Sequence, residues 1–309
     1  MCIRDRYYTV GNPFACEPFQ DWAGRAGLAR ATVLEPFAGR NSLIERLEEL
    51  GLCSRWRTFD ILPGAPGVVQ RDSLVHFPTG FDVCITNPPW LAKNSATARG
   101  LAFPNSRHDD LYKFALEKCL HHCPWVAALV PESFIRAGLF QRRLESFVSL
   151  TGAMFSDTDH PVGLALFTPE PCADVMVWSG QNPVGSLAAL RDHLPKARTR
   201  QQRERRRQLR FNDPEGNLGL IALDNTRGPS IRFCPPEELE KYCISHSSRA
   251  LTRIHVPFSF SIRDCNRFLH GFRDHTRDVL LTCYRGLRQD GMYRRRLDWG
   301  LAREIVAYV

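Results

Sequence analysis

The sequence has no run of about 18 apolar residues, which is the length that a membrane-spanning helix requires. Its N-terminus is polar and charged and lacks the apolar core of a secretory signal peptide. The eleven cysteines are scattered, without the paired spacing of a disulfide framework or a zinc finger. We therefore expect reduced thiols, a cytoplasmic location and no contact with a membrane.

The length of the chain and the distribution of its charge both predict that it folds as two parts. A chain of 309 residues with 43% hydrophobic content can bury one core of ordinary size and a smaller second one. Residues 1–169 carry 17 basic and 17 acidic side chains, whereas residues 170–309 carry 24 basic and 16 acidic ones. We expect a first domain over residues 1–170 and a smaller basic region over residues 171–309.

One segment of the C-terminal region is especially basic. Lys196 to Arg210 contains eight basic residues and a single acid. Such a run attracts polyanions and releases counterions when it binds them. Nucleic acid is the expected partner, and a solvated helix or a linker is the alternative interpretation. The arginines expected to contact the nucleic acid are Arg203, Arg205, Arg206 and Arg207.

Short apolar runs alternate with helical patterns in the first domain. Strands are expected at residues 31–34, 55–59, 68–70, 81–86 and 125–130, and helices at 41–50 and 109–122. This alternation predicts an α/β fold with a mostly parallel, doubly wound sheet, which binds ligands at the carboxyl ends of its strands. In the C-terminal region, strands are expected at 175–178, 218–223 and 230–233. The last part of the region, with Arg294, Arg295 and Arg296 before Trp299, is expected to be helical.

Polar side chains stand at four of the expected strand ends. Glu35, Asp60, Asp72 and Asn87 each stand at or just past the end of a strand. Because parallel strands end at one edge of the sheet, we expect the four to line one crevice. Each of them alone is also explained by a loop cap or an exposed turn.

The segment Asn87-Pro88-Pro89-Trp90 joins a neutral amide, a stiff backbone and a large flat ring directly after a buried strand. These groups suit a planar substrate that carries a nitrogen. The alternative is structural, because Asn-Pro-Pro also forms turns and a Trp often covers a core.

Together these segments resemble the S-adenosylmethionine-dependent DNA methyltransferases that modify the N6 amine of adenine. The resemblance spans residues 7–168: Glu35 to Gly39 is similar to the first cofactor motif, and Asn87 to Trp90 to the catalytic motif. The order of the motifs, with the basic region after both, resembles the gamma arrangement. The resemblance implies a Rossmann-like class I methyltransferase fold with S-adenosylmethionine as the cofactor.

The resemblance also assigns cofactor-binding roles. Asp60 stands where the family has its ribose-binding acid, and Asp72 where an acid meets the adenine amine of the cofactor. Asn41 replaces the second glycine of the first motif, and asparagine tolerates a positive φ better than most residues. The full expected set is Tyr8, Thr9, Glu35, Pro36, Phe37, Ala38, Gly39, Asn41, Asp60, Ile61, Asp72, Ser73 and Asn87.

The resemblance implies Asn87, Pro88, Pro89 and Trp90 as catalytic residues, and Phe155 as a substrate contact beside Trp90. Lys93, which follows the catalytic motif, is also an expected substrate contact, and a solvated helix position explains it equally well. Extrusion of the target base from duplex DNA costs a few kcal/mol, and stacking on Trp90 can return roughly 1 to 3 kcal/mol. The Asn87 side-chain oxygen and the Pro88 carbonyl can accept the two N6 hydrogens. Positioning and charge stabilisation then carry the reaction without a general base.

Cys119, His122 and Cys123 share one expected helix at a spacing that can serve a metal. No fourth ligand is evident nearby, and buried cysteine is common, so we expect no metal site.

Three functions remain open. The first is site-specific, adenine-specific DNA methylation on a flipped base, in a restriction-modification or phage setting. The second is the same chemistry on an RNA base or a protein glutamine. The third is a catalytically weak nucleic-acid-binding protein with this fold.

Overall fold

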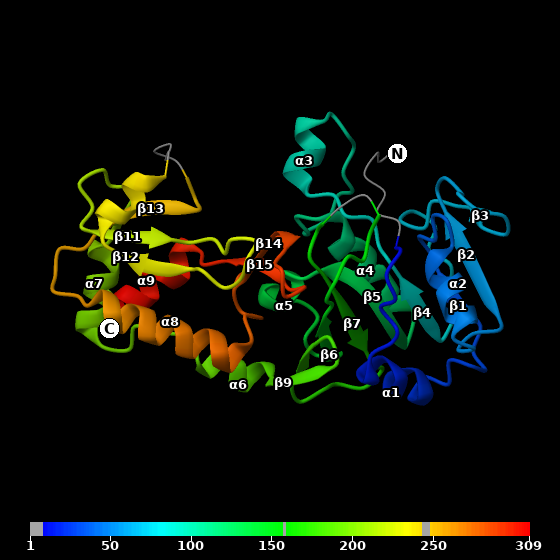
Figure 1. The fold of residues 1–309 in the computed structure, drawn as a ribbon. Helices are drawn as coiled ribbons and strands as arrows, with labels where there is room; N and C mark the ends of the chain where they lie inside the picture. Colours follow the sequence, from blue (N-terminus) through cyan, green and yellow to red (C-terminus); the bar gives the residue numbers. More distant parts are fainter. Residues whose placement is uncertain (1–8, 157–158, 243–247) are drawn as a thin grey trace. The chain divides into compact units, whose positions relative to one another are not determined.

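The computed structural model describes residues 9–156, 159–242 and 248–309 (Figure 1). The chain forms two compact units, Met1–Pro183 and Val184–Val309. This division lies later than the expected boundary at residue 170, because β8 (Met176–Ser179) pairs with β6 (Leu144–Ser149) in the sheet of the first unit. Among the described residues, no helix combines the length and the apolar character needed to cross a membrane.

A nine-stranded mixed sheet, in the order β3-β2-β1-β4-β5-β7-β6-β8-β9, forms the centre of unit 1, and its last strand, β9, continues past Pro183. The first five strands run parallel, and β7 runs antiparallel to β5 and β6. The other strands are β1 (Val33–Glu35), β2 (Trp56–Asp60), β3 (Val69–Gln70), β4 (Val83–Thr86), β5 (Trp125–Pro131), β7 (Val162–Phe167) and β9 (Asn182–Ser186). The helices are α1 (Glu17–Arg25), α2 (Ser42–Glu49), α3 (Lys93–Ala98), α4 (Leu111–His122) and α5 (Phe134–Ala137).

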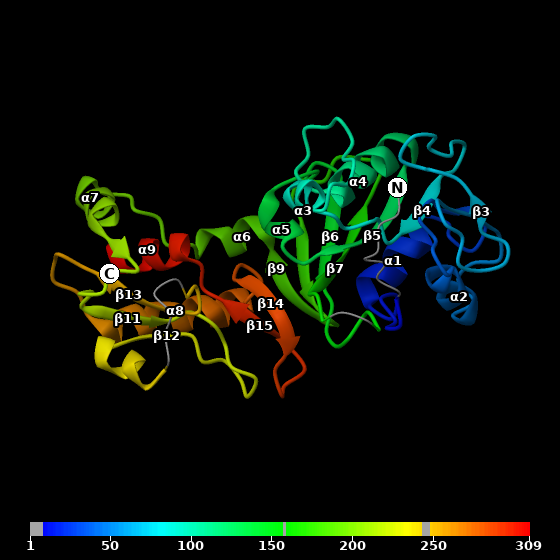
Figure 2. The same ribbon diagram turned by 90° about the horizontal axis from the view of Figure 1, so that it is seen from above.

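The strand order reverses between β1 and β4. The chain builds outward from β1 through β2 to β3, and then crosses to β4 and β5 on the other side of β1. Figure 2 shows α1 and α2 on one side of the sheet and α4 and α5 on the other. The expected α/β class and the mostly parallel, doubly wound sheet are therefore confirmed. Ligands bind such sheets at this reversal, outside the carboxyl ends of the strands.

Strand β4 shows why the central strands have continuously apolar sequences. All four of its residues are buried. Val83 and Ile85 belong to the core cluster that contains residues of α1 and α2. Cys84 instead contacts Cys119 of α4 and Cys123, which caps the end of that helix. A strand that helices cover on both faces has no position for a solvated side chain.

Unit 2 contains a four-stranded antiparallel sheet in the order β10-β13-β11-β12, and a separate ribbon of β14 and β15. The strands are β10 (Arg210–Phe211), β11 (Leu218–Ile221), β12 (Arg232–Cys234), β13 (Leu251–His255), β14 (Thr282–Leu287) and β15 (Tyr293–Arg296). The helices are α6 (Leu187–Asp192), α7 (Arg200–Gln208), α8 (Ile262–Thr276), α9 (Trp299–Tyr308) and the 3-10 helix η1 (Pro236–Lys241).

The expected helix from Arg294 onward is only partly correct. Arg294 to Arg296 belong to β15, and Arg295 and Arg296 pair with Cys283 and Thr282 of β14. The helix begins at Trp299, because the Asp298 carboxylate accepts the Leu301 N–H at 2.9 Å and caps its first turn.

Candidate active site

Glu35 joins the two loops that flank the reversal of the sheet. It ends β1 and is 1% exposed. Its Oε1 accepts the Thr86 hydroxyl at 2.7 Å and the Phe37 N–H at 2.9 Å. The backbone of Asn87 also donates to this carboxyl group. One side chain therefore holds together the loop after β1, which is similar to a cofactor motif, and the loop after β4, which contains Asn87.

The burial of Glu35 changes its protonation. Burial raises the pKa of Glu35 to about 8, against hydrogen bonds from Thr86, Phe37 and Asn87 that lower it, while nearby Asp60 raises it further. The carboxyl group is therefore mostly protonated at neutral pH. A cationic group placed beside it would favour the charged form, so that binding of a cation here releases a proton.

The loop after β1 is a tight turn. Gly39 has a φ of +53° and Asn41 a φ of +68°. Asn41 therefore adopts the left-handed conformation in place of a second glycine, directly before α2. The two Asp60 oxygens accept the N–H groups of Gly39 and Leu62, both at 2.8 Å. Asp60 thus fixes this turn from the end of β2.

The polar groups at this edge fit a ligand with hydroxyl and amino groups. Asn41 Oδ1 and Ser73 Oγ are buried and have no hydrogen-bond partner among the described residues. Unpaired buried oxygens are costly, and donors on a bound ligand would satisfy them. Asp60 and Asp72 are carboxylates at the same edge, where they already accept backbone N–H groups. These residues fit the ribose and amino groups of S-adenosylmethionine.

The segment from Asn87 to Trp90 leaves β4 at the same edge. The Leu91 N–H donates to Asp110 Oδ1 at 3.2 Å, and Ala92 forms an isolated bridge with Asp110. Asp110 also caps α4 by accepting the Tyr112 N–H. The loop is therefore anchored on α4 and has little freedom after Trp90.

Aromatic side chains surround Trp90. Its half-buried ring lies edge-on to Phe155, with centroids 5.4 Å apart and planes at 87°. His160 lies edge-on at 6.5 Å. Thr9 pairs with Phe155, so the N-terminal segment lies beside this cluster. Two expected substrate contacts, Trp90 and Phe155, are thus brought together.

The remaining expected residues of the first half of the chain divide into three groups. Pro36, Phe37, Ala38, Ile61, Pro88 and Pro89 lie in the loops after β1, β2 and β4, at the same carboxyl edge. Lys93 begins α3, is exposed, and places its ammonium 6.0 Å from the Phe103 ring. Tyr8 lies outside the described residues.

The four arginines expected to contact nucleic acid lie in α7 of unit 2 and make contacts within that unit. The Arg205 guanidinium lies 5.0 Å from the Phe258 ring, and Arg206 pairs with Glu304 of α9. Arg203 donates to backbone oxygens of residues 198 and 199. Arg207 is the most exposed of the ion-paired arginines in the helix, with 78% of its side chain accessible.

The cysteines of α4 belong to the core. Cys119 and Cys123 contact Cys84 of β4, and burial raises the pKa of the Cys84 thiol well above its ordinary value. Thiolates, not thiols, bind metals. Within the part of the chain that the structure describes, no group of three potential ligands could hold a metal ion.

Sequence reasoning missed Thr86, Asp110 and His160. Thr86 is the last residue of an apolar strand, and no local signal distinguishes it from its neighbours. Asp110 has the sequence signal of a helix cap, but its bond to the loop of Trp90 depends on the tertiary structure. His160 reaches Trp90 from the connection between β6 and β7.

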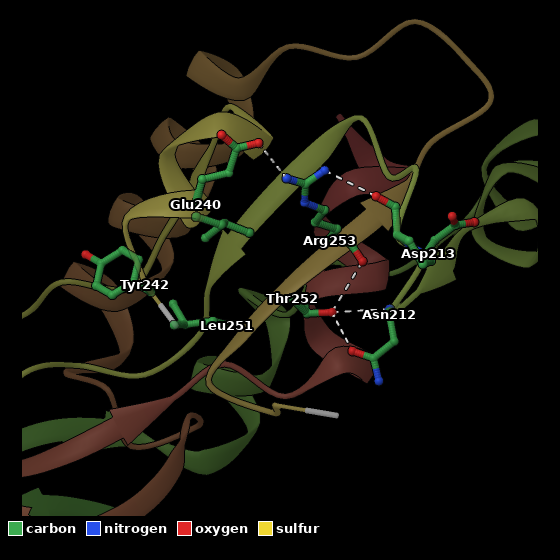
Figure 3. A pocket seen from close by; sticks show the side chains of 9 residues that line it. Asn212, Asp213, Glu240, Tyr242, Leu251, Thr252 and Arg253 are labelled. Atoms are coloured by element: carbon green, nitrogen blue, oxygen red, sulfur yellow. Dashed lines mark hydrogen bonds and ion pairs between the residues drawn. The ribbon is translucent and has the colours of Figure 1, made fainter. Parts of the chain in front are cut away.

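A cavity of about 270 Å³ lies in unit 2 (Figure 3). It is lined by residues of η1, β13 and the turn after β10, none of which is an expected site residue. Its polar groups bond to one another: Thr252 donates to Asn212 at 2.9 Å, and Arg253 pairs with Glu240 at 3.0 Å. This internal pairing leaves little to recognise a ligand, whereas the edge of the sheet in unit 1 retains unsatisfied polar atoms.

No protein-family model and no curated protein sequence matches this chain. Solved structures align with about half of it at low identity. A protein provisionally described as a modification subunit of a type I restriction enzyme from Vibrio vulnificus is 16% identical over 56% of this chain and 47% of its own, with a TM-score of 0.38.

Two further structures give similar values. The type I restriction-modification methyltransferase subunit from Streptococcus thermophilus is 16% identical over 56% of this chain and 48% of its own, with a TM-score of 0.36. A provisional class I S-adenosylmethionine-dependent methyltransferase from Listeria monocytogenes is 13% identical over 56% of this chain and 68% of its own, with a TM-score of 0.34. The aligned region spans less than half of the Vibrio and Streptococcus chains, and TM-scores of this size do not assign a family.

Proposed function

We propose that this protein is a DNA methyltransferase that transfers a methyl group from S-adenosylmethionine to the N6 amine of adenine in DNA. The proposal rests on one observation. Glu35 joins the loop after β1 to Asn87 at the reversal of a doubly wound sheet. A loop that suits a nucleoside-containing ligand and a loop with an amide and an aromatic ring therefore share one edge.

The residues after β1, β2 and β3 would hold the cofactor. Asp60 and Asp72 would accept hydrogen bonds from ribose and adenine donors, and Asn41 and Ser73 would use oxygens that have no partner among the described residues. S-adenosylmethionine supplies an electrophilic methyl group when it is bound. Glu35, once ionised, would favour the positive charge that this ligand carries.

The residues after β4 would hold the target base. Trp90 offers a half-buried ring that Phe155 and His160 orient from the edge. The Asn87 side-chain oxygen and the Pro88 carbonyl would accept the two N6 hydrogens and direct the nitrogen lone pair toward the methyl group. The nitrogen would form its new bond to the methyl carbon as the bond from that carbon to sulfur breaks, so that S-adenosylhomocysteine is the leaving group. The extra proton on the nitrogen would then be lost to water. Alignment carries most of the acceleration.

Asn41 bears on the alternative of a protein that binds without turnover. The reason for that alternative was that Asn41 replaces the second glycine of the first cofactor motif. With a φ of +68°, Asn41 makes the turn that the glycine would make. This supports an intact cofactor loop and favours the enzyme. A cytoplasmic location and a restriction-modification setting remain predictions from the sequence.

The test is transfer of a labelled methyl group by the full-length protein to duplex DNA of mixed sequence, followed by mapping of the modified positions. Asn87→Ala is expected to abolish transfer and to leave the dissociation constant for S-adenosylmethionine nearly unchanged. Asn182→Ala makes the same chemical change at an exposed position of β9 and is the matched control. Methylation of cytosine, or transfer only to RNA or protein, would refute the proposal.

A further inference from the structure

The last two strands of unit 2 form a ribbon of their own. β14 and β15 pair with each other in a separate two-stranded antiparallel sheet. They contain four arginines, Arg285, Arg294, Arg295 and Arg296, and no acidic residue. The ribbon is therefore a small element with a high positive charge.

A bulge exposes part of this ribbon. Cys283 pairs with Arg295 and Leu287 pairs with Tyr293, so residues 284–286 stand opposite Arg294 alone. Gly286 has a φ of +86°, and the two residues before it, Tyr284 and Arg285, are exposed. Bulges redirect side chains and often do so at functional sites. Here the Arg294 guanidinium lies 5.3 Å from the Tyr284 ring, so that an aromatic ring and basic groups share one surface.

The backbone of Asp224 anchors the ribbon to the rest of unit 2. Asp224 donates its N–H to the Arg295 carbonyl at 2.9 Å and accepts Arg294 Nε on its own carbonyl at 2.7 Å. Tyr293 and Arg295 are 2% and 1% exposed. One side of the ribbon is thus buried while the bulge remains in solvent.

The side chain of Asp224 reinforces this anchor. It is fully buried and accepts Arg273 at 3.0 and 2.8 Å and Arg288 at 3.0 Å. Burial alone would raise the pKa of Asp224, but Arg273 and the N–H groups of Ser230 and Ile231 hold it below its ordinary value. Arg288 lies in the turn of the ribbon and also pairs with Asp290 there. The bulge is therefore presented by a rigid support.

We propose that this ribbon enters the major groove of duplex DNA, where Tyr284 and Arg285 contact the base edges. The inference rests on the proposed function, because it identifies a surface that holds the polymer substrate. The major groove of B-DNA, about 12 Å wide, admits a two-stranded ribbon, and arginine binds the N7 and O6 atoms of guanine. The major groove of an RNA duplex is too deep and narrow for such contacts, so the shape favours DNA.

The ribbon is a different surface from the arginines of α7. Arg205 and Arg206 of α7 contact Phe258 and Glu304 and help to hold that helix in place. Exposed Arg285 is positioned by a bulge whose neighbours are an aromatic ring and further arginines. The ribbon therefore combines charge with a shape that can read bases.

The experiment measures binding of labelled duplex DNA to the full-length protein between about 50 and 200 mM salt. Arg285→Gln removes a charge at an exposed position, and Arg263→Gln makes the same change on the exposed face of α8. Protection of guanine N7 from dimethyl sulfate reports contact in the major groove. Tyr284→Ala provides a second variant, and thermal melting verifies folding.

Arg285→Gln is expected to weaken DNA binding about tenfold, to lower the salt slope by about one and to abolish N7 protection. Arg263→Gln should leave all three unchanged. Unchanged binding and protection in both ribbon variants would overturn the inference, as would equal binding of an RNA duplex. If the wild-type protein protects guanine N7 but transfers no methyl group, the ribbon inference stands and the proposed function falls. If the Arg285→Gln variant binds and methylates DNA as well as the wild type does, the proposed function stands and the ribbon inference falls.

Discussion

Replacement of Glu35 by glutamine tests the electrostatics at the centre of the candidate site. Glutamine has the shape of a protonated glutamate, and its oxygen can still accept the Phe37 N–H and the Thr86 hydroxyl. The substitution therefore removes a titrating group from a fully buried position and changes little else. Any difference in pH dependence between the two proteins reports the proton on Glu35.

The magnitude follows from the pKa of Glu35, which rises from 4.5 to about 8 on burial. Between these values the folded protein holds a proton that the unfolded chain has released. The stability that this proton contributes is complete below about pH 4.5 and is lost as the pH rises to about 8. At about 1.4 kcal/mol for each pH unit, the loss is on the order of 5 kcal/mol.

Urea unfolding at a series of pH values from about 5 to about 9 measures this difference. Tryptophan fluorescence reports mainly on unit 1, because five of the six tryptophans lie in it. The free energy of unfolding of Glu35→Gln minus that of the wild type should rise with pH and level off above about pH 8. Glu45→Gln, on the exposed side of α2, controls for the loss of a carboxylate.

A difference that stays constant within about 1 kcal/mol across this range would refute the reasoning. It would mean that Glu35 is ionised in the folded protein at neutral pH. A cation or a hydrogen-bond donor stronger than Thr86 would then be needed to explain its burial.

Three further results are expected. Affinity for S-adenosylmethionine, measured by calorimetry, should fall as the pH drops below about 8, because protonated Glu35 does not favour a cation, and Glu35→Gln should flatten this dependence. Asp224→Asn should destabilise unit 2 by about 3 to 5 kcal/mol in chemical denaturation, since it leaves buried guanidiniums unpaired. The surface change Asp264→Asn should cost at most about 1 kcal/mol. In thermal melting, Asn41→Gly should keep or slightly raise stability, whereas Asn41→Ala should cost about 1 kcal/mol at a φ of +68°.

The sequence was sufficient to predict the first half of the large sheet. The short apolar runs that predicted strands form β1 to β5, and the segments with helical spacing of apolar residues form α2 and α4. Each depends on contacts that local residue type already favours. The strand-end residues Glu35 and Asn87 could be found for the same reason, because the rule for parallel sheets places them at one edge.

The ribbon β14–β15 could not be predicted in this way. Arg294, Arg295 and Arg296 have no strand preference as a group. They form a strand because β14 pairs with them and because Asp224, from outside the ribbon, binds Arg294 and Arg295. The role of Thr86 is equally non-local, since Glu35 lies 51 residues before it in the chain. Buried polar pairs join segments that no local pattern connects.

The anchor and the exposed bulge of the ribbon are made by different residues. Asp224 binds the side chain of Arg294 and the backbone of Arg295, whereas residues 284–286 form the bulge. Substitutions at Tyr284 and Arg285 therefore leave the buried charges intact. Natural variation or selection from a library can change these two positions without loss of folding, which makes the bulge a segment where a new binding preference can evolve.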